Sequence, residues 1–546
     1  MKSKSALKWI INNSKSVVIQ LVLLTLISAL TAVCLVGFTY FSKQVVDIAT
    51  KSSYGNFLNN IICLIFLIVI ELILHVVYSR LSIKISGKLE MNIKTNVFNK
   101  LLKKDISAIY NYHTGDLLNR ITGDTLVITN SFVNIVPLLV SLVTRLTGAF
   151  IMLFWLDKYF ALIYLVCGPL FFLTTQIYSK KMKSLHKKCQ ETDGKVKSYI
   201  QEALSNILVI KAFKTENAIS KETLDIQKVN YNYKLKRNTI SIVANIFVYI
   251  AFTFGYYFAL GWGAYKLSLN LISVGTLTAM LQLVSQVQTP LKGLSGIIPQ
   301  YFHAIASSER IMEIEDLKED EISFSDEYIN SFKDEIKSIV FSSVTFKYDD
   351  RNTVIEDFSY EIGVGEFVAI SGISGIGKST LLKLLLGVIK PLTGEIYFLL
   401  KNGEKVYINE KTRGLFSYVP QGNMVLSGSI EDNIRFFNDS VSEDEIKRVC
   451  KISKVDDFLC DLPDGLKTIV GEKGVGLSEG QIQRVAIARA LISDAQFLLL
   501  DEATSALDEQ TEKDFLCEVK KLHSKTCIII SHKQAAFDIC DKTIKF

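Results

Sequence analysis

The chain has 546 residues, of which 49% are hydrophobic and 21% are charged, and its formal net charge is +6. This composition excludes an intrinsically disordered chain, which combines low hydrophobicity with a high net charge. The 9 cysteines are too few and too widely spaced for a small disulfide-stabilised scaffold. The net charge is too small to indicate nucleic-acid binding by itself, and the length predicts more than one domain.

Long apolar stretches dominate the first half of the chain. A helix needs about 20 apolar residues to cross a hydrocarbon core about 30 Å thick. Six stretches approach that length, and a soluble protein could not easily bury them all, so we predict a transmembrane domain over residues 1–312. The predicted spans are, approximately, 17–41, 58–78, 135–155, 160–177, 240–262 and 267–287.

Lysine and arginine are distributed unevenly between these spans. With the N-terminus placed in the cytoplasm, the inner segments 1–16, 80–134 and 179–238 carry 26 of these residues, and the outer loops carry four. The positive-inside rule then predicts a multi-pass integral membrane protein in contact with lipid, in a bacterial-type plasma membrane, with both termini cytoplasmic. Helical spacing in the two longer inner segments predicts helices that extend into the cytoplasm and return as hairpins.

The composition changes after residue 312. Acidic residues concentrated between 313 and 335 predict a solvated linker, and residues 336–546 are expected to form a second domain. Short strand-like stretches alternate there with helical patterns, which is typical of an α/β domain with a largely parallel sheet. The clearest of these stretches are Phe367–Ser371, Phe497–Leu500 and Cys527–Ser531.

A phosphate-binding motif follows the first of these strands. Residues 372–380 match G-x-x-x-x-G-K-[ST] in the strand–loop–helix context that the motif requires. Backbone N–H groups of such a loop surround phosphates, Lys378 is expected to reach the β- and γ-phosphates, and Ser379 to ligate Mg²⁺. The residues expected to contact the nucleotide are Gly372, Ser374, Gly375, Gly377, Lys378, Ser379 and Thr380.

A second apolar strand ends in two carboxylates, Asp501 and Glu502. Asp501 is expected to hold Mg²⁺ together with Ser379, and Glu502 to polarise a water molecule beside the γ-phosphate. Paired carboxylates at a strand end are often only solvated, but the phosphate loop upstream favours the functional interpretation. The predicted fold class is therefore an all-α six-helix transmembrane domain with long cytoplasmic extensions, followed by an α/β P-loop NTPase domain.

The stretch 477–481, with the sequence LSEGQ, resembles the signature of ATP-binding cassette (ABC) proteins. Nearly the whole chain resembles a half-transporter of the ABC exporter family, in which six membrane helices precede a nucleotide-binding domain. Residues 115–120 and 274–276 are typical of such membrane domains. Two positions depart from the family pattern, because Glu479 replaces a common glycine and Ile469 replaces a common acidic residue.

The resemblance implies roles for further residues. Tyr348 corresponds to the aromatic residue that stacks on adenine, and Asp508 to a loop that crosses between two ATPase domains. Gln421 corresponds to a glutamine that contacts Mg²⁺ and the attacking water, and His532 to the histidine beside the γ-phosphate. The implied cofactors are ATP and Mg²⁺. The signature residues expected to contact nucleotide bound by a second subunit are Ser478, Gly480 and Gln481.

One chain contains one phosphate loop and one signature, so the resemblance implies a dimer. A homodimer is favoured because every residue expected to support hydrolysis is present, and a heterodimer with a second half-transporter stays open. The implied function is ATP-driven export of an amphipathic cargo, such as a peptide, a lipid or a drug-like molecule, by alternating access. The alternative is a membrane ATPase that regulates a partner without moving cargo. Import and nucleic-acid binding are disfavoured.

Three ionisable residues lie within the predicted spans. Glu71 and His75 share one face of the second span, and Arg145 lies midway along the third. Charged groups inside a bilayer are costly and usually face a partner or a cavity. We expect Glu71 to pair with Arg145 and to line or support the cargo pathway, and a purely structural ion pair is the alternative.

Overall fold

The computed structural model describes residues 2–546 apart from 111, 321–325, 349–352, 374, 423, 472–473, 475 and 523–524. Side chains at 2–4, 164–181, 183, 186–187, 244, 248, 289–296, 298–299 and 326–327 also lie outside the described set. Ser374, expected in the phosphate loop, is therefore not described. The chain divides into two compact units: Met1–Asn99 with Thr114–Glu315, and Lys100–His113 with Asp316–Phe546.

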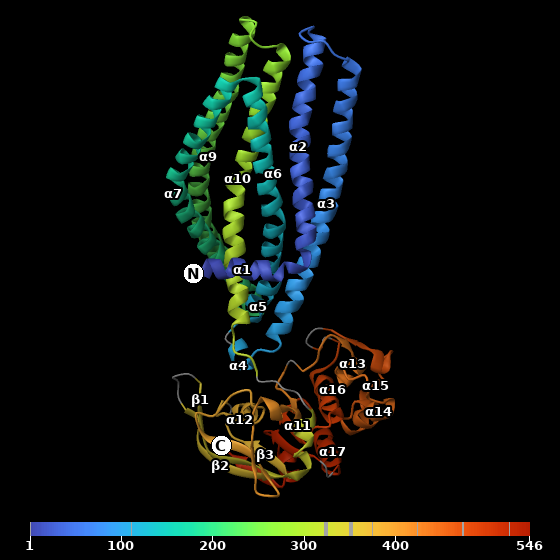
Figure 1. The fold of residues 1–546 in the computed structure, drawn as a ribbon. Coiled ribbons are helices and arrows are strands. Elements are labelled where there is room, and N and C mark those ends of the chain that lie inside the picture. The colour runs from blue at the N-terminus through green and yellow to red at the C-terminus, as the bar shows by residue number, and fades with distance from the viewer. Residues whose placement is uncertain are drawn as a thin grey trace. The chain divides into compact units, whose positions relative to one another are not determined.

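The first unit is a set of long helices (Figure 1). Four of its described helical segments are long and apolar enough to cross a membrane: 15–49, 57–101, 114–156 and 216–268. The span expected at 160–177 falls in a helix whose side chains are largely outside the described set. The elements are α1 (Lys2–Asn13), η1 (Lys15–Val17), α2 (Val18–Ala49), α3 (Phe57–Leu101), α5 (Thr114–Asn119), a π-helical turn η2 (Arg120–Asp124), α6 (Thr125–Leu156), α7 (Lys158–Ser205), α8 (Ile207–Ala212), α9 (Glu216–Ser268) and α10 (Val274–Glu315).

The helix boundary near residue 270 differs from the expectation. The sixth span was predicted to begin at 267, but α9 continues to Ser268 and α10 begins only at Val274. Between them Asn270 has φ of 55°, a left-handed conformation that asparagine tolerates better than most residues and that no helix can continue through. Apolar residues on both sides of this turn concealed it in the sequence.

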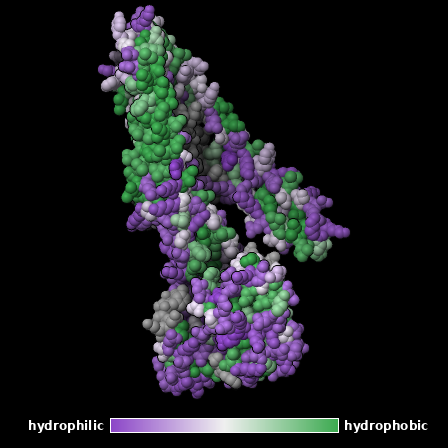
Figure 2. All heavy atoms as spheres, turned by 90° about the vertical axis from the view of Figure 1, so that its right-hand side faces the viewer, coloured by the Kyte–Doolittle hydropathy of each residue, from purple (hydrophilic) through white to green (hydrophobic). Residues whose placement is uncertain are grey.

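The long helices of the first unit expose a broad apolar surface, which Figure 2 shows on the face turned to the viewer. On α3 the apolar window contains no buried residue. Ile62, Phe66 and Leu72 are each more than 60% exposed. Exposed apolar surface of this extent is unfavourable in water and favourable in a lipid bilayer, so it indicates the lipid-facing side of the unit.

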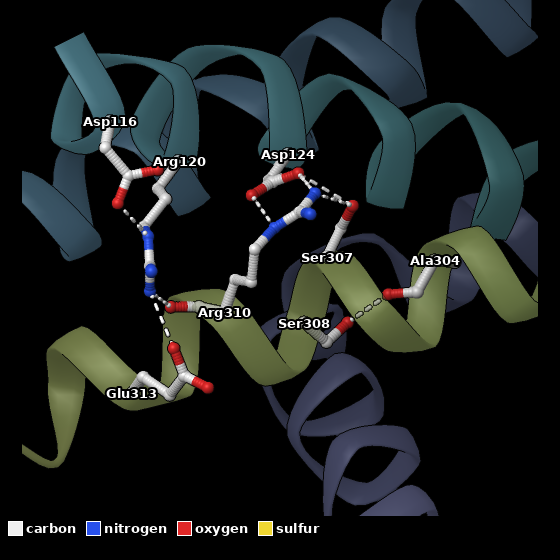
Figure 3. Close-up of polar contacts among 8 residues, drawn as sticks. All are labelled: Asp116, Arg120, Asp124, Ala304, Ser307, Ser308, Arg310 and Glu313. Carbon is white, nitrogen blue, oxygen red and sulfur yellow. Dashed lines mark hydrogen bonds and ion pairs between the residues drawn. The ribbon is translucent and has the colours of Figure 1, made fainter. Parts of the chain in front are cut away.

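A polar network ties η2 to the last turns of α10 (Figure 3). Asp124 is 2% exposed; Arg310 Nε donates to its Oδ2 at 2.8 Å and Ser307 Oγ donates to its Oδ1 at 2.8 Å. Arg120 donates to the backbone oxygen of Arg310 at 2.7 Å, and it also bonds Asp116 and Glu313 at 2.9 Å each. Because a buried carboxylate needs donors to offset its lost hydration, this network fixes the two segments against each other.

Four acidic residues after 312 have polar partners; the expectation of a solvated stretch holds for Glu313 and Glu319, whose side chains are 57% and 62% exposed, but is wrong for Asp320. Each faces a donor on another segment of its own unit, and the side chain of Asp320 is only 6% exposed. A run of acidic residues cannot show in sequence which donors will face it. The contacts are Glu313 with Arg120 (2.9 Å), Glu315 with Trp9 (2.8 Å), Glu319 with Lys104 (3.0 Å) and Asp320 with Arg413 (3.1 Å).

The second unit contains the α/β fold, and its described strands form three sheets. A five-stranded parallel sheet has the order β11-β3-β10-β9-β6, a four-stranded antiparallel sheet has the order β2-β1-β4-β5, and β7 pairs with β8. The parallel core sheet agrees with the predicted fold class, whereas the antiparallel sheet was not predicted. The strands are β1 (Ile336–Lys347), β2 (Thr353–Gly363), β3 (Phe367–Ser371), β4 (Thr393–Leu400), β5 (Lys405–Tyr407), β6 (Phe416–Val419), β7 (Gly428–Ser429), β8 (Ile469–Val470), β9 (Phe497–Asp501), β10 (Thr526–Ile530) and β11 (Lys542–Lys545).

Helices cover the parallel sheet, and α16 packs with α13, α14 and strand β6 (Figure 1). Strand residues alternate between two apolar clusters: Leu498 and Ile529 lie in one, and Leu499 and Ile528 in the other. The parallel sheet is therefore buried on both faces. The helices are α4 (Ile106–Ile109), α11 (Asp326–Asn330), η3 (Lys333–Glu335), α12 (Lys378–Leu385), η4 (Glu410–Leu415), α13 (Ile430–Arg435), α14 (Glu443–Ile452), α15 (Asp456–Leu459), η5 (Gly465–Lys467), α16 (Glu479–Ile492), α17 (Glu509–Lys520) and α18 (Gln534–Ile539).

The network at Asp124 predicts a measurable loss of stability in Asp124→Asn. This change removes the charge that Arg310 and Ser307 satisfy, and hydrogen bonds to charged groups contribute about 2 kcal/mol. Asp116→Asn is the matched control, because its side chain is 44% exposed and exposed pairs contribute about 0.5 kcal/mol. Thermal unfolding in detergent should show a clearly lower melting temperature only for Asp124→Asn, and equal melting temperatures would contradict the account.

Candidate functional site: a nucleotide site at the carboxyl edge of the parallel sheet

Four neighbouring parallel strands deliver polar residues to one edge of the sheet. Strand β3 leads into the phosphate loop, and β9 ends at Asp501. Strands β10 and β6 are followed within two residues by His532 and Gln421. Because parallel strands end at the same edge, residues that lie more than 100 positions apart in the chain meet there.

The phosphate loop has the backbone conformation that glycine permits. Gly375 has φ of 85° and Gly377 has φ of 117°, both in the left-handed region. A Cβ atom at Gly377 would lie 2.8 Å from Val354 Cγ1, so no side chain fits there. Lys378 is 5% exposed, and its Nζ donates to the backbone oxygens of Gly372 at 2.7 Å and Ile373 at 3.2 Å. The amine is thus held inside the loop.

The oxygen atoms expected to ligate Mg²⁺ lie together. Ser379 Oγ donates to Asp501 Oδ1 at 2.8 Å, and Asp501 is 3% exposed. Burial raises the pKa of Asp501, while the hydrogen bonds from Ser379 and Tyr418 act in the opposite direction. Hydroxyl and carboxylate oxygens are the hard donors that Mg²⁺ prefers, so the residues present fit this ion.

Glu502, Gln421 and His532 form a group beside this pair. Gln421 Nε2 donates to Glu502 Oε2 at 2.7 Å, and His532 Nε2 lies 3.7 Å from Glu502 Oε1. His532 Nε2 is also 3.3 Å from Lys378 Nζ. Glu502 has φ of 50°, a strained conformation for a residue with a side chain. The structure therefore brings the three expected catalytic side chains together next to the phosphate loop.

Tyr348 lies at the other side of the loop. Its hydroxyl is 3.3 Å from Thr380 Oγ1, and its ring packs edge-on against Phe346 with centroids 4.8 Å apart. The side chain is 40% exposed. An aromatic ring that is partly exposed beside the loop can stack on a base.

The signature residues lie elsewhere in the second unit. Ser478 is the N-cap of α16, and Gln481 is used in the same capping box, where its Oε1 accepts the Ser478 N–H at 2.8 Å. A Cβ atom at Gly480 would lie 3.0 Å from the oxygen of Ala506. Asp508 caps α17 through Thr511, and these hydrogen bonds lower the pKa of its carboxyl. Among the described residues no hydrogen bond or ion pair joins the signature to residues 372–380.

Two contacts at the site were missed in the sequence. Tyr418, one of the strand residues before Gln421, donates its hydroxyl to Asp501 Oδ2 at 3.0 Å. Tyr110, which follows α4, lies with its ring centroid 5.9 Å from Lys383 Nζ. A tyrosine in the short strand before Gln421 was the available signal for Tyr418.

Comparison with known proteins agrees with this architecture. Residues 21–291 match the ABC transporter transmembrane region and residues 355–505 match the ABC transporter family. The chain is 31% identical to ABC transporter B family member 1 of Dictyostelium discoideum, over 93% of this chain but only 55% of that relative's length. It is 30% identical to an ATP-dependent lipid A-core flippase of Wigglesworthia glossinidia brevipalpis, over 82% of this chain and 77% of the flippase.

A solved structure of a bacterial Atm1-family ABC exporter with ATP bound shares the fold. The TM-score is 0.80 at 23% identity, and the match covers 97% of this chain and 93% of the exporter chain. Apolar helices joined to a phosphate-loop domain define a membrane-embedded ATPase. The chain belongs to the ABC transporter family, as an exporter-type half-transporter whose ATP hydrolysis is coupled to transport.

The two loop glycines allow a matched test. Gly375→Ala and Gly377→Ala both force a left-handed residue, but only Gly377→Ala also drives a Cβ atom against Val354. The left-handed conformation costs about 1–2 kcal/mol, and overpacking adds about 1–3 kcal/mol. In thermal unfolding, Gly377→Ala should therefore have a lower melting temperature than Gly375→Ala. The reverse order would show that the loop does not hold the conformation described.

Proposed function

We propose that this chain exports an amphipathic cargo as a dimer with two composite sites for ATP and Mg²⁺. The observation that carries this proposal is the carboxyl edge of the parallel sheet. Lys378, Ser379, Asp501, Glu502 and His532 meet there, while the signature begins α16 and, among the described residues, has no hydrogen bond or ion pair to the loop. The family resemblance implies a site made of a phosphate loop and a signature. The phosphate loop of one chain therefore supplies half of a site, and the signature of a second chain supplies the other half.

The residues of one half-site divide the chemistry between them. Lys378 balances the charge of the β- and γ-phosphates. The backbone N–H groups of the loop surround these phosphates, and Gly372, Gly375 and Gly377 allow the backbone to curve around them. Ser379, Asp501 and Gln421 hold Mg²⁺, which when bound neutralises phosphate charge. Tyr348 stacks on adenine, with Thr380 holding its hydroxyl.

Hydrolysis depends on the group around Glu502. Glu502 accepts a proton from the attacking water, Gln421 orients that water, and His532 donates toward the γ-phosphate. Ser478, Gly480 and Asp508 of a second copy complete the site across the dimer, with Gln481 shaping the turn that presents them. A homodimer is sufficient, because this chain supplies both halves.

The proposed orientation of the transmembrane domain rests on the distribution of charge and apolar surface. The transmembrane domain spans residues 1–312, the linker 313–335 and the cassette 336–546. Both termini are cytoplasmic, since the inner segments carry most of the lysine and arginine. Cargo enters from the cytoplasm or inner leaflet, and an amphipathic lipid is one candidate because a relative at 30% identity is named a lipid A-core flippase.

The first test is Glu502→Gln in lipid nanodiscs, with this chain expressed alone. Loss of the general base should lower kcat by about 10²–10⁴-fold while ATP binding persists. Glu443→Gln is the control, since this exposed carboxylate begins α14 and has no place in the proposed site. Unchanged hydrolysis in Glu502→Gln would contradict the proposed role. No hydrolysis by the wild-type chain, despite ATP binding, would contradict a self-sufficient homodimer.

Arg145 provides a test of the cargo pathway. Its Nε is buried without a hydrogen-bond partner. Among the described residues it makes no direct ion pair with Glu71, although the Glu71 charge acts on it at longer range, so the expected close contact is absent in this conformation. Replacing a charge that lacks a close partner inside a membrane domain should not destabilise it. Arg145→Gln should therefore keep or raise the melting temperature and reduce ATP-dependent cargo accumulation in vesicles. Unchanged accumulation would remove Arg145 from the pathway.

A further inference from the structure

The carboxylate of Asp501 is held from two sides. Ser379 Oγ, in the first turn of α12, donates to Oδ1 at 2.8 Å. Tyr418, on β6, donates its hydroxyl to Oδ2 at 3.0 Å. Each carboxylate oxygen therefore has its own donor, and the plane of the carboxylate cannot rotate without breaking one bond.

The two donors differ in what they do when a metal binds. The Ser379 oxygen is itself an expected metal ligand, so it would contact the ion as well as Asp501. The Tyr418 phenol is not needed as a ligand and can keep its bond to Asp501 throughout. The position of Tyr418 relative to β9, which ends at Asp501, is fixed by strand pairing. Tyr418 is opposite Leu499 and Val419 is opposite Leu500 in the parallel register.

Tyr418 also lies close to Gln421 in the chain. Strand β6 ends at Val419 and continues through Pro420 to Gln421. Tyr418, Gln421 and Asp501 line one cavity of 540 Å³, together with Tyr110 and Lys383. A hydrogen bond from Tyr418 thus joins the metal carboxylate to the strand that carries Gln421.

We propose that Tyr418 is a positioning residue that orients Asp501 for Mg²⁺ and keeps the Gln421 segment at a fixed position relative to Asp501. This inference rests on the proposed magnesium–ATP site. A phenol is protonated at neutral pH, so the Tyr418 hydroxyl is a donor to Asp501. Because the hydroxyl acts only through Asp501, its loss should weaken metal binding without disturbing the nucleotide contacts of the loop.

The test is Tyr418→Phe, which keeps the ring that packs in the apolar cluster and removes only the hydroxyl. ATP binding is measured with a fluorescent ATP analogue in detergent, in a Glu502→Gln background, across a Mg²⁺ titration and in EDTA. The Mg²⁺ concentration for half-maximal binding should rise about tenfold, as expected for a lost hydrogen bond to a charged group. Affinity in EDTA and the melting temperature should stay unchanged.

Tyr397→Phe is the control, because Tyr397 is a buried tyrosine on β4 of the antiparallel sheet. An unchanged Mg²⁺ requirement in Tyr418→Phe would overturn the inference. A fall in melting temperature and in EDTA affinity together would also overturn it, by showing a packing role. If binding by the Glu502→Gln protein with Tyr418 intact does not depend on Mg²⁺, the proposed metal site itself fails, which is a different outcome from failure of Tyr418 alone.

Discussion

The parallel register of four strands is the constraint on which the nucleotide site depends. β3, β10, β9 and β6 are neighbours that all end at one edge, and they bring together residues that are distant in sequence. Burial of the sheet on both faces keeps the register, since a slip would move alternate apolar side chains out of their clusters. The positions of Asp501, His532 and Gln421 thus follow from packing in the core rather than from contacts within the site.

Much of this site could be predicted from local sequence. The phosphate loop is contiguous, and each of its glycines is required by a short-range conformation, so residues 372–380 were identifiable by themselves. Asp501 and Glu502 were identifiable because an apolar strand ends in acid there. The fold class followed from the contrast between long apolar stretches and the later alternation of strands and helices. These signals all lie within a few consecutive residues.

Contacts between distant segments could not be predicted in the same way. The bond from Tyr418 to Asp501 depends on which strands are neighbours, and residue periodicity does not specify strand order. The donors that face the acidic linker and the lack of a direct contact between Glu71 and Arg145 were unpredictable for the same reason, because charge alone does not determine which groups will meet. The turn at Asn270 was hidden because its flanks are apolar.

The central claim is that each ATP site combines the phosphate loop of one chain with the signature of another. Dimers carrying two different affinity tags, in a Glu502→Gln background, can be purified with Lys378→Ala on one chain and Ser478→Arg on the other. Such a dimer retains one intact site and should occlude one labelled ATP. A dimer that pairs the unmodified background with the double variant retains none and should occlude none. Equal occlusion by the two dimers would contradict the composite site.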